Sequence, residues 1–171
     1  EDLNLISHFQ IISNPLHLHP KTTQRMKTPQ EILDLYYYKG WNKADEAVIK
    51  ECLSEDVKCQ LAFQKRRKRG HEGFLEYVRS THDAIGRHMM KIDEIVVNAE
   101  GTKASVRMTN RGVHKGSFFG VAGSGHEISW AATAFFSFAD GKITEIWALA
   151  DLDSLKRQIG ADMDAAPFST Q

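Results

Sequence analysis

Two polar residues stand on an apolar face of the sequence where they could act on a substrate. Residues 103–114 alternate as a strand does, so that Asn110 and His114 share one face with Met108. A neutral histidine can remove a proton from a carbon next to a carbonyl, and amide or phenol groups can stabilise the enolate that forms. With the phenol of Tyr37, His114 and Asn110 form the candidate catalytic set.

Each candidate also has a structural interpretation. A single inward histidine is often a hydrogen-bonded core residue, and an inward asparagine such as Asn110 can satisfy neighbouring backbone groups. Trp41, Trp130 and Trp147 are more often packing residues than binding platforms, and Trp130 is the best candidate for a cavity wall. The residue types alone leave both interpretations open.

The elements that must position these residues follow an α+β order. Thr28-Pro29-Gln30-Glu31 combines a capping box with proline at the first helical position, and Gly40 ends the helix that starts there. A second helix is expected at about 44–53, followed by a strand at about 57–63 and a third helix at about 74–85. Strands are then expected at about 87–98, 103–114, 127–138 and 143–151. A curved antiparallel or mixed sheet of this kind can wrap around the N-terminal helices and leave an internal apolar pocket.

Strand parity predicts what lines that pocket. Trp130, Ala134 and Phe136 fall on the apolar face of strand 127–138, whereas Glu127 and Thr133 fall on the other. The pocket should therefore be apolar and aromatic.

Composition bounds the remaining possibilities. The chain has 171 residues with 22 basic and 22 acidic side chains, so bulk charge predicts neither a nucleic-acid partner nor a membrane surface. We expect a barrel-like domain at 28–160, an N-terminal extension at 1–27 and a C-terminal tail at 161–171. Cys52 and Cys59 lack metal-ligand or disulfide spacing, which favours reduced thiols in a cytoplasmic protein.

Two further motifs favour no special function. His17 and His19 could bind a metal, but two imidazoles without a third ligand make a poor site, and no metal is expected. The five cations of residues 65–69 could contact phosphate, yet they lack interleaved aromatics, and a solvated loop is the favoured interpretation.

From Gly112 onward the chain carries a recognisable order of residues. A G-x-H-x-G unit spans 112–116, and further matches follow at Asp140-Gly141-Lys142-Ile143, Glu145, Trp147, Asp151 and Gln158-Ile159-Gly160. Upstream, similar residues stand at Trp41-Asn42, Asp56-Val57, Gly70-His71-Glu72-Gly73 and Glu100-Gly101. In this order and spacing, residues 29–160 resemble the SnoaL-like polyketide cyclases. The resemblance implies the cone-shaped fold shared with ketosteroid isomerase, scytalone dehydratase and limonene epoxide hydrolase.

The resemblance also implies a function. Such cyclases close a ring in an aromatic polyketide by an intramolecular aldol reaction, without cofactor or metal, in a closed apolar cavity. The resemblance would place Tyr37, Trp41 and His114 near the substrate, and Gln60 at a strand position that is often polar in the family. A hydrophobic small-molecule substrate and a homodimer are the expected partners. The other expected substrate contacts are His82, Met108, Trp130 and Phe136.

The sequence departs from the family where an acid usually faces the cavity. Many members carry G-x-D there, but this chain has Ala132-Thr133-Ala134, and Ile146 and Ala148 replace a frequent His and Asp. Either another acid such as Asp83 serves, or the reaction differs, or the pocket only binds.

Three hypotheses from different classes follow. The first is a cofactor-independent enzyme acting on a hydrophobic polyketide or terpenoid-type metabolite, as a cyclase, an isomerase or an epoxide hydrolase. The second is a small-molecule-binding protein that has lost the family acid at Ala134. The third is an association domain that pairs through the outer sheet face, where Arg107, Arg111 and Glu127 argue against a dry interface.

Overall fold

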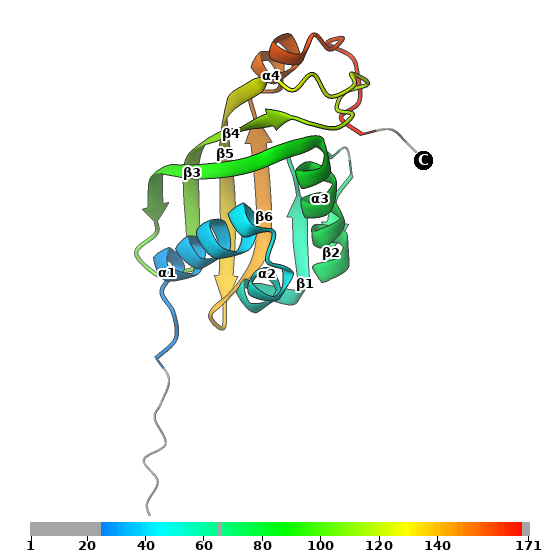
Figure 1. The fold of residues 1–171 in the computed structure, drawn as a ribbon. Coiled ribbons are helices and arrows are strands. Elements are labelled where there is room, and N and C mark those ends of the chain that lie inside the picture. The colour runs from blue at the N-terminus through cyan, green and yellow to red at the C-terminus, as the bar shows by residue number, and fades with distance from the viewer. Residues whose placement is uncertain (1–24, 65, 169–171) are drawn as a thin grey trace, which may run out of the picture.

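The computed structural model describes residues 25–64 and 66–168, in which helices cover one face of a six-stranded sheet (Figure 1). The helical elements are α1 (Pro29–Asp34), the π-helical turn η1 (Leu35–Gly40), the 3-10 turn η2 (Trp41–Lys43), α2 (Glu46–Cys52), α3 (Gly70–Ala84) and α4 (Leu152–Ile159). The strands are β1 (Leu53–Gln60), β2 (Lys68–Arg69), β3 (Ile85–Val97), β4 (Lys103–His114), β5 (Glu127–Ala139) and β6 (Lys142–Ala150).

The expected α+β class is confirmed, but the expected barrel is wrong. The strand order is β2-β1-β6-β5-β4-β3, with β1 parallel to β6 and the other pairs antiparallel. β2 and β3 are therefore the two edges of an open mixed sheet. Closure would need these edges to pair, and β2 offers only Lys68 and Arg69, which already pair with β1.

Local signals in the sequence set most helix ends. The capping box at Thr28 forms, because the Glu31 amide donates to Thr28 Oγ1 at 3.3 Å and the Thr28 amide donates to Glu31 Oε2 at 2.7 Å. Asp45 and Asp151 accept amide hydrogen bonds at the starts of α2 and α4. These caps lie within a few residues of the groups they satisfy, which is why the sequence predicts them.

Two segments between α2 and α3 differ from expectation. The strand expected at 57–63 runs instead from Leu53 to Gln60, because Leu61 and Gln64 close a turn with an amide-to-carbonyl distance of 3.1 Å. In the run of cations, residues 68–69 form the edge strand β2, and Lys68 pairs with Glu76 at 2.8 Å. Arg66 and Arg67 are exposed, as a solvated loop predicts.

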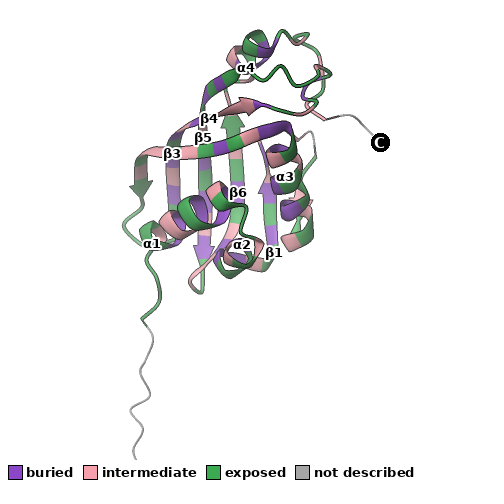
Figure 2. Cartoon of the chain, in the orientation of Figure 1, coloured by how far each residue is buried: buried purple, intermediate pink, exposed green. Residues whose placement is uncertain are grey.

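The parity predicted for the long strands is confirmed. On β4, Met108, Asn110 and His114 are buried, whereas Arg107 and Arg111 are exposed. β5 alternates in the same way, and Figure 2 shows buried and exposed residues alternating along the strands of the sheet. The buried face is the inner face, where a site can be enclosed.

A β-bulge near the start of β3 changes the parity of that strand. Gly86 pairs with Val113 and Met89 pairs with Arg111, so that Arg87 and His88 together oppose Gly112. Arg87 takes a left-handed φ of 52°, which accommodates the extra residue. His88 is thereby turned into the interior, where it is 3% exposed.

Gly112 is the residue that permits this bulge. A Cβ atom at position 112 would lie 2.4 Å from Ile85 Cγ2 and 2.9 Å from the Gly86 carbonyl oxygen. Because that space is filled from the bulged strand, Gly112→Ala should lower the free energy of unfolding by about 2–3 kcal/mol in urea denaturation. Gly86→Ala is the matched control, since its Cβ would meet only the flexible Lys115 side chain at 3.3 Å. Equal unfolding midpoints for the two variants would contradict this account.

Candidate active site

A cavity of about 50 Å³ lies between the helices and the inner face of the sheet. Its wall is mainly apolar and aromatic, and its most polar side chains are His88 and Asn110, with the phenols of Tyr36, Tyr37 and Tyr77. The other inward-facing lining residues are Trp41, Leu61, Ala62, Phe63, Thr81, Met90, Met108, Trp130, Ala132, Ala134, Ile146, Ala148 and Ala150. Within the described part of the chain, no aspartate or glutamate lines it.

Four small residues on the sheet leave the space. Ala132 pairs with Ala150 and Ala134 pairs with Ala148 across β5 and β6, and all four line the cavity. Ala134 is 2% exposed, so a family acid at this position would be fully buried. The alanine methyl group in place of the family acid removes that charge and makes the floor of the cavity apolar.

His88 is enclosed by aromatic rings. Its imidazole stacks on Trp130 at a centroid distance of 5.7 Å and an interplanar angle of 6°, and it meets the edge of Trp41 at 5.9 Å. Neither ring nitrogen has a well-formed hydrogen bond within residues 25–64 and 66–168. Burial and, to a lesser extent, the nearby His82 lower the pKa of His88 to about 3, while the Asn110 amide partly opposes the shift. His88 is therefore neutral near pH 7.

Hydrogen-bond donors line the same cavity. Asn110 is 1% exposed, and its Nδ2 atom lacks a partner within the same ranges. The Tyr36 hydroxyl accepts a hydrogen bond from Trp41 Nε1 at 2.8 Å. Burial raises the pKa of Tyr36, Tyr37 and Tyr77, so these phenols stay protonated. The site thus combines one neutral imidazole with protonated donors.

His114 faces inward as predicted, but it is not one of the cavity-lining residues. It is fully buried, and its Nδ1 atom lies 3.2 Å from Ser124 Oγ and 3.4 Å from the Ser124 amide, which donates to it. The His114 backbone also pairs with His126 and Gly125. In this structure His114 holds residues 115–126 against the sheet.

Gly116 of the G-x-H-x-G unit lets the end of β4 approach the end of α3. A Cβ atom on Gly116 would lie 2.6 Å from the Asp83 carbonyl oxygen at the end of α3. Both Lys115 and Gly116 donate backbone hydrogen bonds to the Ala84 carbonyl at 2.9 Å. The motif therefore fastens the end of β4 to the end of α3.

The structure brings only part of the predicted site together. Tyr37, Asn110, Trp41, Met108 and Trp130 line the cavity. The residues placed outside the lining are His114, Asp83, Gln60, His82 and Phe136.

Those outside the lining make other contacts. Asp83 is exposed on α3, and the Gln60 amide donates to the Gln64 carbonyl at 3.1 Å. His82 Nε2 donates to the Trp41 carbonyl oxygen at 2.9 Å, and its ring lies 5.4 Å from that of His88. Phe136 packs edge-on behind Tyr37 at 6.1 Å.

His88 is the residue that sequence reasoning missed. It falls within the strand predicted at 87–98, but strict alternation from the buried Ile85 would turn it outward. The only signal in the sequence is that Arg87-His88-Met89-Met90 fits neither parity cleanly. The bulge depends on Gly112 in the neighbouring strand β4, so the sequence of residues 87–90 alone does not reveal it.

Other expected features concern metals, thiols and membranes. Among the described residues, no group of three or more His, Cys, Asp or Glu side chains could hold a metal ion, and His17 and His19 lie outside those residues. Cys52 and Cys59 are free and buried, and burial raises the pKa values of their thiols to about 11 and about 12. No helix in the described ranges is long and apolar enough to span a bilayer.

Comparison with known proteins identifies the family. The model of the SnoaL-like polyketide cyclases matches residues 31–159, and the chain belongs to this family. Membership places the protein among polyketide-related enzymes without specifying a reaction. No curated protein matches the chain.

Solved structures share the fold. A Jannaschia sp. CCS1 protein described as a SnoaL-like polyketide cyclase is 20% identical, with a TM-score of 0.71 over 78% of this chain and 92% of that one. TsrD from Streptomyces laurentii is 26% identical, with a TM-score of 0.69 over 78% and 95%. A Pseudomonas putida KT2440 protein described as a polyketide cyclase is 24% identical, with a TM-score of 0.68 over 78% and 98%.

The buried imidazole makes stability depend on pH. The pKa of His88 is about 3 in the folded protein, against an ordinary value of 6.5, so the unfolded chain binds the additional proton between these values. Acidification through this window therefore destabilises the fold, by about 2 kcal/mol between pH 7.5 and pH 5. His88→Phe, which keeps an aromatic ring against Trp130, should remove this part of the loss in urea denaturation at the two pH values. The control His126→Gln, at an exposed position, should retain the full loss of stability. If His88→Phe loses as much stability as the wild type between the two pH values, the assignment to His88 is refuted.

Proposed function

We propose that the protein is a cofactor-independent enzyme that closes or isomerises a ring in a hydrophobic polyketide or terpenoid-type metabolite by acid/base chemistry. The observation that carries this proposal is the neutral, buried His88 imidazole facing an apolar cavity beside the Asn110 amide. Buried polar atoms are nearly always hydrogen-bonded in native proteins. A substrate with a carbonyl oxygen next to an acidic C–H group would satisfy both side chains.

In the proposed reaction, His88 takes a proton from the carbon next to the carbonyl. The electrons of that C–H bond move into the carbonyl group and give an enolate, whose oxygen accepts hydrogen bonds from Asn110 Nδ2 and the Tyr37 hydroxyl. For ring closure, the enolate carbon attacks a second carbonyl of the same molecule, and the new alkoxide takes the proton back from His88. For isomerisation, the proton returns to a different carbon.

The low pKa of His88 is compatible with this role. Removing a proton from a neutral substrate creates an imidazolium and an enolate together, so the cation forms beside an anion. In a cavity of low dielectric constant, their attraction offsets the desolvation that lowers the pKa of His88 in the protein alone. We therefore assign proton transfer to His88, and a structural role to His114 because it is not one of the cavity-lining residues.

Two other functions fit the site less well. Epoxide opening generally needs an acid for the epoxide oxygen and a base for water, and the described lining contains no carboxyl group. A protein that only binds its ligand is favoured by Ala134, which stands where the family acid is expected. The unused hydrogen-bonding capacity of His88 and Asn110 favours catalysis over this alternative.

Exchange of protons next to a carbonyl tests the proposal without knowledge of the natural substrate. In D₂O, the wild-type protein should accelerate deuterium uptake at the carbon atoms beside the carbonyl of 2-tetralone, as followed by NMR. His88→Gln should lower this rate by about 10²- to 10⁴-fold, because it removes the proton acceptor. His114→Gln is the matched control and should keep most of the activity. Unchanged exchange in His88→Gln would sink the assignment, and binding without exchange in the wild type would favour the carrier alternative.

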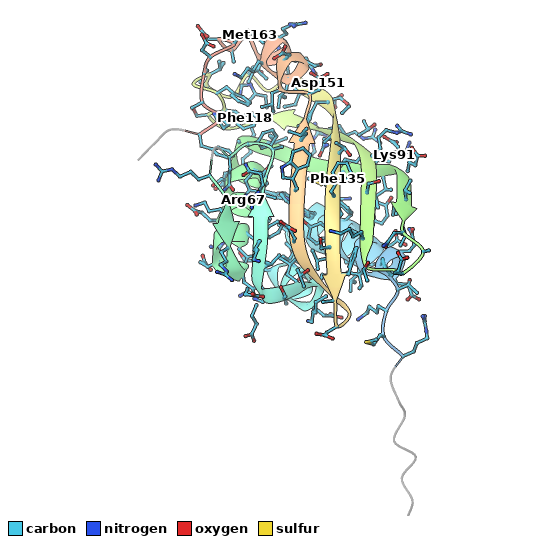
Figure 3. All side chains as sticks on the ribbon, turned by 180° about the vertical axis from the view of Figure 1, so that it is seen from behind. Arg67, Lys91, Phe118, Phe135, Asp151 and Met163 are labelled. Atoms are coloured by element: carbon cyan, nitrogen blue, oxygen red, sulfur yellow. The ribbon has the colours of Figure 1, made fainter. Side chains whose placement is uncertain are left out.

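We also propose that the protein is a homodimer that pairs through the outer face of the sheet. Val96, Phe135, Trp147 and Leu149 expose 57%, 50%, 38% and 52% of their surface there. Phe135 and Trp147 pack against each other at 5.8 Å, and Figure 3 views Phe135 from this uncovered side. Large exposed apolar patches commonly mark protein contacts.

Several charges on the outer face are already paired with one another. Arg107 lies 3.4 Å from Glu94 and 3.7 Å from Asp93, and Arg87 lies 3.7 Å from Glu127. These ion pairs partly compensate Arg107 and Glu127, two of the three charged residues that argued against a dry interface on sequence grounds.

Light scattering coupled to size-exclusion chromatography tests the dimer. The double variant Phe135→Ser/Trp147→Ser should elute as a monomer at a protein concentration where the wild type is a dimer, because it removes the aromatic centre of the patch. Tyr38→Ser, which replaces a residue 42% exposed on the helical side, should leave the mass unchanged. A monomeric wild type, or a double variant that stays dimeric, argues against the interface.

A further inference from the structure

The cavity is too small for the substrate of the proposed function. Its volume of about 50 Å³ holds a few water molecules, whereas sites for drug-sized ligands commonly have roughly 300–1,000 Å³. A two-ring apolar molecule can therefore enter only if part of the cavity wall moves.

One wall is supported from outside by the C-terminal segment. Phe63 and Tyr77 line the cavity, and the ring of Phe168 contacts them at centroid distances of 6.4 Å and 6.5 Å. Phe168 also packs on Phe118 at 5.6 Å. It is not itself a lining residue, so it closes the aromatic wall from behind.

The strap, which we define as residues 161–168, lies beyond the family match that ends at residue 159. It runs from α4 beside the loop between β4 and β5 toward α3 (Figure 1), and Figure 3 labels Met163 and Phe118 along this path. Within the described ranges, two backbone hydrogen bonds join it to the rest of the fold. The Phe119 amide donates to the Pro167 carbonyl at 2.9 Å, and the Ala161 amide donates to the Lys156 carbonyl at 2.9 Å. A segment fixed by so few bonds can open without disrupting the sheet.

Lys156 ties the strap to the wall. Its side chain is buried, with 7% exposure, and the Nζ atom lies 5.0 Å from the centroid of the Phe119 ring. The same ammonium donates a hydrogen bond to the Met163 carbonyl oxygen. A buried cation held by a ring face and a carbonyl makes a specific anchor, because both contacts are lost when the strap leaves.

We infer that the strap is the gate and size filter of the cavity, with Phe168 as its plug and Lys156 as its anchor. When Phe168 leaves, Phe63 and Tyr77 lose the ring behind them and can turn outward, which enlarges the space beside His88. This inference rests on the proposed function only in that the cavity takes an apolar ligand. It assigns to Phe168 the control over which apolar molecules enter.

Stopped-flow binding of 2-naphthol, followed by quenching of tryptophan fluorescence, tests the gate. In the wild type, the observed rate should reach a plateau as the 2-naphthol concentration rises, because strap opening precedes binding. Phe168→Ala and a chain ending at Gly160 should bind at least tenfold faster, and Lys156→Met several-fold faster. Met163→Ala is the matched control, because it keeps the carbonyl that accepts from Lys156 and changes a side chain 44% exposed.

The outcomes separate this inference from the proposed function. Rates in Phe168→Ala and the shortened chain equal to the wild type, or no binding to either, overturn the gate even if His88 proves essential for deuterium exchange. Faster binding to strap variants supports the gate even if no variant catalyses exchange. Should the shortened chain fail to fold, Phe168→Ala decides the matter, since it changes one side chain.

Discussion

The bulge at Arg87 and His88 is the constraint on which the site depends. In a regular strand, side chains alternate between the faces, and His88 would point to the same side as Gly86. One extra residue opposite Gly112 reverses that parity and carries the imidazole between Trp41 and Trp130. The bulge is possible because Gly112 lacks a side chain where Ile85 packs. Gly112 belongs to the same family motif as His114, but it serves the site by letting His88 turn inward.

The surroundings of His88 connect packing to chemistry. Alanines on β5 and β6 provide space, aromatic rings exclude water, and the resulting desolvation keeps the imidazole neutral. With an apolar residue at 134, no buried carboxylate competes for the proton there. Although Ala134 replaces the family acid, His88 can still accept a proton among protonated donors. This requires that the imidazolium forms only together with the substrate anion.

Much of the fold follows from short-range patterns. The capping box at Thr28, the Asp140-Gly141 turn and the alternation along 103–114 and 127–138 each involve neighbouring residues, and each prediction holds. The structure places only part of the candidate catalytic set at the cavity. The inward orientation of His114 was predicted correctly, but its position relative to the cavity was not. His114 and Asn110 share a face of β4, yet Asn110 lines the cavity, whereas His114, four residues further along the strand, contacts Ser124 instead.

The sequence by itself determined the α+β class, the helix starts, the parity of the central strands and the family, because these depend on local periods, caps and the order of motifs. Tertiary structure alone decided that the sheet stays open, that His88 faces the cavity and that Phe168 closes its wall. The reason is physical: a cavity is the space left by contacts between residues far apart in the chain, such as His88 with Trp130 and Phe63 with Phe168. Such contacts are fixed by register and packing across elements, and no local pattern encodes them.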